Sequence, residues 1–297
     1  SGNARRPALA GAGDHRGETV VTTGLHDDFS RGVGDHWQRM ELSSGHVDWT
    51  GASVRLVNDN TSAGRYSNAQ IDDCQGRPRK ELLWSPPLHL TVRARFSHPA
   101  PPLRAGGDCD YEYLGGPILS GTAGFGFWNA PSTLEGHGLP ALPRALWFFY
   151  ASPPSNIKLA SATPGCGWKA ATFDASGWPF RLLALTAPVA VPLMNWQAAY
   201  RRLWPIGQRA IGVSEAPVAA DMTEWHTYVI QWEEKRARFL VDGDVALDCD
   251  TVPRGPLGLV IWLDNQSLVL TPQGRLRHRL LHQPEKQWLE MAEIEIA

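Results

Sequence analysis

The chain of 297 residues carries 28 basic and 30 acidic side chains, which gives a formal net charge of -2. This balance excludes the strongly basic surface that nucleic-acid binding requires. With 43% apolar and 20% charged residues the chain is not disordered as a whole, and its 29 glycines and 23 prolines are too frequent for a helical bundle. The composition favours many short strands.

Residues 1–23 are rich in glycine, alanine and arginine and lack hydrophobic periodicity, so we expect a flexible N-terminal arm there. Residues 24–297 are expected to form one domain. From His26 onward, short apolar runs between turn residues predict β-strands. The expected strands are 36–42, 45–49, 53–57, 66–72, 80–85, 88–97, 122–129, 144–151, 226–233, 236–242, 244–249, 257–264, 267–270 and 287–296.

Alternation of apolar and polar residues within these runs is typical of half-buried antiparallel strands. Asp242 and Gly243 lie between two such runs and form the dipeptide of a two-residue hairpin turn. So many short strands with hairpin spacing predict an all-β chain folded as a two-sheet antiparallel sandwich or jelly roll.

A long segment, residues 170–224, interrupts the strand pattern. Residues 182–200 carry no charge and have the length of a membrane-spanning helix, but Pro188 and Pro192 argue against a span. Insertions of this length in a β domain are usually lids or binding elements. We therefore expect a partly helical lid that packs on the sandwich, and no membrane span.

One helix is expected within this insertion. Pro192 suits its first turn, and Pro205 is expected to end it. Trp196, Tyr200 and Leu203 are spaced to share one face, which we expect to point inward.

Three stretches resemble a known family. They are Asp27 to Ser30 followed by Trp37, then residues 225–243 with a Trp-His-x-Tyr start and a Phe-x-Val-Asp-Gly hairpin, and the closing run 288–296. This pattern resembles the concanavalin A-like jelly rolls of glycoside hydrolase family 16 and the laminarinase-like proteins, over residues 26–170 and 224–297. The resemblance implies a two-sheet antiparallel jelly roll.

The family resemblance also implies a catalytic strand with the pattern Glu-x-Asp-x-x-Glu. The matching run here, residues 144–152, contains no acidic residue. Retaining hydrolysis requires two carboxyl groups about 5 Å apart. We therefore carry over no catalytic residue of the family and predict no cleavage of β-glucans by its mechanism.

Asp264 is the candidate catalytic residue. It follows an apolar run expected at the sandwich centre and shares a strand face with Trp262 and Gln266. Burial beside an indole raises the pKa of a carboxyl and suits it to acid–base chemistry. The alternative is a strand-end aspartate that bonds turn amides.

Candidate ligand-binding residues lie on the same expected central strands and in the insertion. They are Trp262, Gln266, Asn265, Trp128, Asn129, Trp147, Tyr150, Gln70, Asp72 and Trp196. Alternatives stay open for several: Gln70 and Asp72 also suit a turn, Asn129 also suits a cap, and half of each aromatic strand must face the core.

No cofactor or metal is expected. The glycines of 121–126 lack the lysine and helix of a phosphate-binding loop, and the histidines lack ligand spacing. The acidic stretch 108–112 matches no calcium loop and favours a solvated loop. The four cysteines, Cys74, Cys109, Cys166 and Cys249, show no paired spacing of the kind that zinc sites use, so we expect free or buried thiols, with disulfides as the alternative. No secretory signal is visible, which favours a cytoplasmic protein.

Three functions fit the sequence. The first is a non-hydrolytic enzyme, a cyclase or isomerase, that binds an apolar or amphipathic small molecule in an aromatic concave cleft, since polar groups there are few. The second is a carbohydrate-binding protein or a divergent glycoside hydrolase. The third is a structural or interaction protein.

Overall fold

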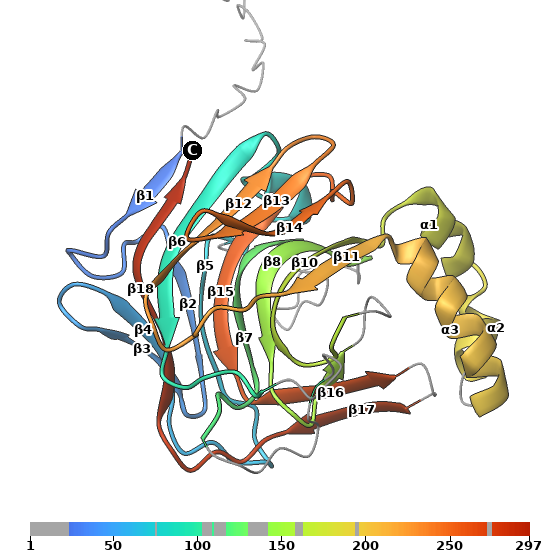
Figure 1. Ribbon diagram of the computed structural model, residues 1–297, viewed down its shortest axis with the longest axis horizontal. Coiled ribbons are helices and arrows are strands. Elements are labelled where there is room, and N and C mark those ends of the chain that lie inside the picture. Colours follow the sequence, from blue (N-terminus) through green and yellow to red (C-terminus); the bar gives the residue numbers. More distant parts are fainter. Residues whose placement is uncertain are drawn as a thin grey trace, which may run out of the picture.

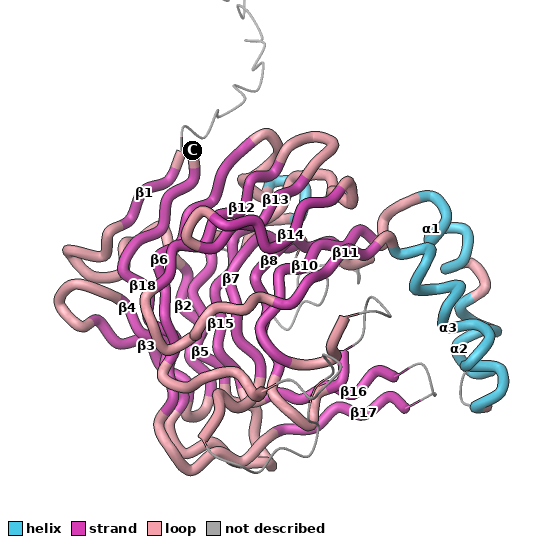
Figure 2. Tube along the Cα trace, viewed as in Figure 1, coloured by secondary structure: helices cyan, strands magenta, loops and turns pink. Residues whose placement is uncertain are grey.

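The computed structural model describes residues 24–74, 76–102, 109, 117–129, 142–157, 163–193, 196–271 and 275–297. Two large antiparallel sheets pack against each other, and helices project from one side (Figure 1). Strands are the main regular structure of the described chain, whereas the helices gather at that one side (Figure 2). The predicted all-β jelly-roll sandwich is therefore confirmed.

The first sheet has eight strands in the order β14-β13-β12-β6-β18-β4-β3, with β1 paired to β18. Its strands are β1 Leu25–Asp27, β3 Gly45–Trp49, β4 Val54–Asn58, β6 Leu88–Phe96, β12 His226–Trp232, β13 Ala237–Val241, β14 Asp244–Cys249 and β18 Gln287–Ile296. The β13–β14 hairpin turns at Asp242 and Gly243, both at positive φ, as the dipeptide predicts.

The second sheet has seven strands in the order β11-β10-β8-β7-β15-β5-β2. Its strands are β2 Gln38–Leu42, β5 Asn68–Asp72, β7 Thr122–Trp128, β8 Arg144–Ala151, β10 Gly167–Asp174, β11 Val213–Pro217 and β15 Gly258–Asp264. All the pairings along this order are antiparallel. The strand β7 therefore lies near its middle, between β8 and β15.

The core fills the space between the two sheets. On the seven-stranded sheet, alternate residues such as Phe125, Phe148 and Ile261 are fully buried in it. Phe148 packs edge-on against Phe239 of the eight-stranded sheet, with ring centroids 5.4 Å apart. The remaining residues of each strand point to the opposite side of the seven-stranded sheet, which we call the outer face.

A small third sheet has the order β17-β16-β9 and lies at one end of the sandwich (Figure 1). Its strands are β9 Asn156–Ile157, β16 Gln266–Thr271 and β17 Arg275–Leu280. The expected strand 80–85 is instead a short 3-10 helix, η1 Arg79–Glu81, followed by a single bridge from Trp84 to Leu257.

The helices are α1 Trp178–Ala184, α2 Ala187–Leu193 and α3 Gln197–Ile211, and we call them together the helical projection. They connect β10 to β11, whose pairing extends the sheet on both sides of them. The expected insertion of 170–224 is therefore too wide, because its ends form these two strands.

The expected lid is not what the structure shows. The helical projection extends away from the sandwich (Figure 1), and Trp196 is 68% exposed. Pro192 lies near the end of α2, and Pro205 lies inside α3. An interior proline removes one backbone donor and crowds the preceding turn, yet α3 continues past Pro205 to Ile211 and ends at Gly212, which has a positive φ.

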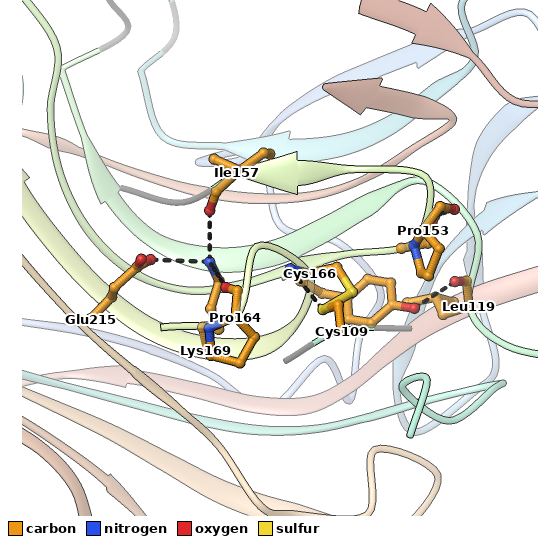
Figure 3. Close-up of a disulfide and its surroundings, with 10 residues drawn as sticks. Cys109, Leu119, Pro153, Ile157, Pro164, Cys166, Lys169 and Glu215 are labelled. Atoms are coloured by element: carbon orange, nitrogen blue, oxygen red, sulfur yellow. Dashed lines mark hydrogen bonds and ion pairs between the residues drawn. A yellow bond between two sulfur atoms is a disulfide. The ribbon is translucent and has the colours of Figure 1, made fainter. Parts of the chain in front are cut away.

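A disulfide joins Cys109 to Cys166, 57 residues apart in the sequence (Figure 3). This bond contradicts the expectation that these two cysteines are thiols. Because the two cysteines are 57 residues apart, no local spacing in the sequence indicates the pair, and only the fold brings Cys166 beside Cys109.

Candidate functional site

The strand register brings residues far apart in sequence together on the outer face. Two neighbouring rows cross it. The first row, from β2 to β11, is Met40, Gln70, Trp262, Gly124, Phe149, Lys169 and Pro217. The second row is Gln38, Asp72, Val260, Gly126, Trp147, Ala171 and Glu215.

Two glycines of β7 make room for aromatic rings in these rows. A Cβ at Gly124 would lie 2.8 Å from the Trp262 ring, and one at Gly126 would lie 2.6 Å from the Cβ of Trp147. Such distances are shorter than any real carbon contact. The indole of Trp262 therefore lies over the β7 backbone because Gly124 has no side chain.

Four aromatic side chains cover the middle of the outer face: Trp128, Trp147, Phe149 and Trp262. We call them the aromatic floor. Trp147 lies at its centre, with ring centroids 5.1 Å from Trp262, 5.8 Å from Phe149 and 6.4 Å from Trp128. The Trp262 ring nitrogen donates to the Thr122 hydroxyl at 3.1 Å, which fixes the indole.

Polar side chains of β5 border the aromatic floor on one side. Gln70 donates to Asp72 at 2.8 Å, and Asp72 also accepts from the Cys74 amide at 3.0 Å. Asn68 precedes them on the same face and donates to Gln70 at 3.4 Å. Amide and carboxylate groups therefore stand beside the rings, where the sequence predicts an apolar cleft with few polar groups, Gln70 and Asp72 among them.

Asp264 is buried at the end of β15. Its carboxylate accepts from the Thr122 hydroxyl at 2.9 Å, the Gln266 amide at 2.9 Å and the Gln266 side chain at 2.7 Å, with longer bonds from the Thr122 amide and the Tyr66 hydroxyl. Burial raises its pKa, although these hydrogen bonds act in the opposite direction. This arrangement fits the structural alternative, in which the carboxylate joins β7, β15 and β16.

On the other side of the aromatic floor lies a buried ion pair. The ammonium of Lys169 donates to Glu215 at 3.0 Å and to the carbonyls of Ile157 and Pro164, both at 3.1 Å (Figure 3). Both side chains are almost fully buried. The pair ties β10 to β11 and to β9, next to Phe149.

Four predicted ligand-binding residues are not on the outer face. Tyr150 points into the core, where its hydroxyl donates to the Leu119 carbonyl. Asn129 is buried and bonds Leu142 and Arg144. Asn265 is buried and its amide donates to backbone carbonyls of distant loops. Trp196 immediately precedes α3 and is exposed.

The other predicted residues do lie together. Trp128, Trp147, Trp262, Gln70 and Asp72 share the outer face, and Gln266 lies at its end beside Asp264. The sequence analysis missed Phe149, Asn68, Lys169 and Glu215. Strand alternation alone was enough to find Phe149, since it is two residues from Trp147.

Among the described residues, no group of three or more histidine, cysteine or acidic side chains is arranged to hold a metal ion. The acidic stretch 108–112 lies outside the described residues except for Cys109.

No family model matches the sequence, and a comparison with curated proteins also yields no match. Solved structures do match. One is described as an endo-acting O-glycanase of human gut microbiota that initiates mucin breakdown, at 13% identity and a TM-score of 0.50 over 92% of this chain and 98% of that chain. Another is a GlcNAcα1-4Gal-releasing endo-β-galactosidase from Clostridium perfringens, at 11% identity and a TM-score of 0.50 over 92% of this chain and 61% of that one.

These comparisons contradict the expectation of a cyclase or isomerase, because the proteins that share the fold are described as enzymes acting on glycans. The aromatic floor supports that correction, since its rings stand beside amides and carboxylates. The chain has the two-sheet jelly-roll fold that resembles glycoside hydrolase family 16, as its sequence motifs predict.

Proposed function

We propose that the protein binds a carbohydrate on the outer face of the seven-stranded sheet. The observation that carries this proposal is the aromatic floor itself, four rings laid over a glycine-containing strand with polar side chains beside them. Sugar rings have apolar C–H faces that pack on aromatic rings, and hydroxyls that need hydrogen-bond partners. The floor offers the first, and the half-buried Gln70, held in place by the buried Asn68 and Asp72, offers the second.

The geometry does not favour hydrolysis by the mechanism that the family resemblance implies. The outer-face residues of β8 are Ala145, Trp147, Phe149 and Ala151, and none is acidic. Asp72 and Asp264 do share the outer face, but their positions are four residues apart along paired strands. At a rise of about 3.3 Å per residue that places their Cα atoms roughly 13 Å apart.

Glycosidases place their two carboxyl groups about 5–5.5 Å apart when retaining and about 6.5–9.5 Å apart when inverting. Asp72 and Asp264 are instead both buried, and their carboxylates are already held by Gln70 and Cys74 and by Thr122 and Gln266. Glu215 is held by Lys169 and is buried. The proposal is therefore binding of a glycan without its cleavage by a carboxylate pair.

The test is titration with laminarin, lichenan and gastric mucin, followed by calorimetry or affinity electrophoresis. Trp147→Ala and Trp128→Ala should each weaken binding at least tenfold, about 1.4 kcal/mol. The matched control is Trp49→Ala, on β3 of the other sheet, where the indole is exposed and far from the floor. It should leave affinity unchanged.

Absence of binding to all three glycans, or an equal loss in Trp49→Ala, would contradict the proposal. Release of reducing ends above background, lost in Asp72→Asn or Asp264→Asn, would instead indicate a divergent glycosidase.

The cytoplasmic location stays a prediction. The cytoplasm keeps most disulfides reduced, whereas Cys109 and Cys166 are bonded here. Trapping thiols in intact cells tests the location, since a fully oxidised pair would count against the cytoplasm.

A further inference from the structure

The helical projection exposes an unusual set of apolar side chains. Seven large apolar residues of the projection are exposed: Trp178, Leu182, Leu185, Val189, Leu193, Trp196 and Ile206. Leu185 is 77% exposed and Trp178 is 74% exposed, so most of each residue's surface is in contact with solvent. Apolar residues gathered in this way on a surface usually mark a binding site for a protein or a membrane.

The charge of the same segment favours a membrane over a protein as the partner. Residues 178–211 contain four arginines and no aspartate or glutamate, in a chain whose formal net charge is -2. Arg181, Arg201, Arg202 and Arg209 are all exposed. Arginine keeps its charge at every physiological pH. The projection is therefore a locally cationic as well as apolar element.

The helices touch each other but extend away from the sheets, joined to them through β10 and β11 (Figure 1). None of the described helices is long and apolar enough to cross a membrane. A helix that lies in the membrane interface instead needs an apolar face, cationic side chains that meet anionic headgroups, and tryptophan at the boundary. The projection has seven exposed large apolar side chains, two of them tryptophans, and four exposed arginines.

We infer that the helical projection binds the surface of an anionic lipid bilayer, with its tryptophans and leucines inserted among the headgroups. The arginines pair with anionic headgroups, whose surface potential attracts cationic segments. This site is separate from the aromatic floor and does not depend on glycan binding.

The experiment is sedimentation of the full chain with unilamellar vesicles. One set contains phosphatidylcholine alone and the other contains 30 mol% phosphatidylglycerol, both at low and high salt. We expect binding to the anionic vesicles at least tenfold tighter than to the neutral ones, and weaker at high salt because exposed charges are screened.

Two matched double variants separate the projection from the rest of the surface. Trp178→Ser with Leu185→Ser should weaken binding to anionic vesicles at least tenfold. Trp49→Ser with Val245→Ser removes one exposed tryptophan and one exposed aliphatic side chain from the eight-stranded sheet and should leave binding unchanged. Arg201→Gln with Arg202→Gln should remove the preference for anionic vesicles.

Three results would overturn the inference. The first is no sedimentation with anionic vesicles, and the second is an equal loss of vesicle binding in the Trp178/Leu185 and the Trp49/Val245 double variants. The third is a wild-type dimer in analytical ultracentrifugation that only the Trp178/Leu185 variant dissociates, when neither the wild type nor that variant binds vesicles. The last result would assign the projection to a second copy of the chain.

Discussion

The aromatic floor and the helical projection both present large apolar side chains outside the core, but they are built differently. In the floor, neighbouring strands place each ring against another ring, and Trp262 against Thr122. In the projection, the described helices contact mainly one another, and Trp178 and Leu185 remain exposed. Burial is therefore decided by tertiary neighbours and not by residue type, and the two regions should respond to mutation in opposite ways.

The largest expected difference concerns charge. Glu215→Gln leaves the buried ammonium of Lys169 without its carboxylate, which costs about 3–5 kcal/mol for a buried pair. Arg201→Gln, in the projection, removes an exposed charge and should change the free energy of unfolding little. Denaturant unfolding of both variants is the measurement. Similar losses would show that the projection is part of the same cooperative structure.

A second difference concerns pH. Burial raises the pKa of Asp73, next to β5, to about 7, although Trp84 and the Leu259 amide donate to it. The folded protein thus holds this proton more tightly than the unfolded chain. The stability that it contributes is complete below pH 3.8 and is lost as pH rises through about 7, by up to about 4 kcal/mol.

Asp73→Asn cannot titrate, so the wild type should lose stability relative to it between pH 4 and pH 8. The exposed Asp59→Asn is the control and should parallel the wild type. The projection holds no acidic residue or histidine, so its helices should not change over this range. Parallel curves for wild type and Asp73→Asn would contradict the prediction.

The third difference concerns space under the floor. Gly126 has a φ of 149°, and a Cβ there would lie 2.5 Å from the Leu146 carbonyl oxygen. Gly126→Ala should therefore destabilise the protein by about 3 kcal/mol, through overpacking and backbone strain together. It should also displace Trp147 and weaken glycan binding. An unchanged melting temperature would show that β7 can shift to accept the methyl group.

Much of the fold was predictable because alternation and turn residues are local signals. The hairpin at Asp242 and Gly243 and most strands were found in this way. The strand β10 was missed because Lys169 interrupts its apolar run. The lysine is buried only because Glu215 lies 46 residues further along, a distance at which no local pattern operates.

The site was predictable in part for the same reason. Trp147 and Tyr150 are three residues apart on one strand, so alternation excludes a shared face, and only Trp147 joins the floor. Asn265 looked available beside Asp264, but its amide bonds Ser62 and Arg65, about 200 residues earlier. Hydrogen bonds at such a separation appear only once the chain has folded.

The smallest expected effect comes from a second glycine-to-alanine substitution, made in the helical projection. Gly207 lies inside α3, and a Cβ there would meet no atom within 4 Å. Gly207→Ala should stabilise the helix by about 0.5–1 kcal/mol, since alanine loses less backbone entropy than glycine. Because the described helices contact mainly one another, this gain should appear as slower amide exchange within α3 while the global unfolding midpoint stays the same. Gly126→Ala is its counterpart on the outer face, where the identical methyl group should lower the global midpoint. If Gly207→Ala instead raises the global unfolding midpoint by an amount that matches the whole helix stabilisation, the projection unfolds together with the sandwich. The floor and the projection would then differ in the exposure of their side chains and not in cooperativity.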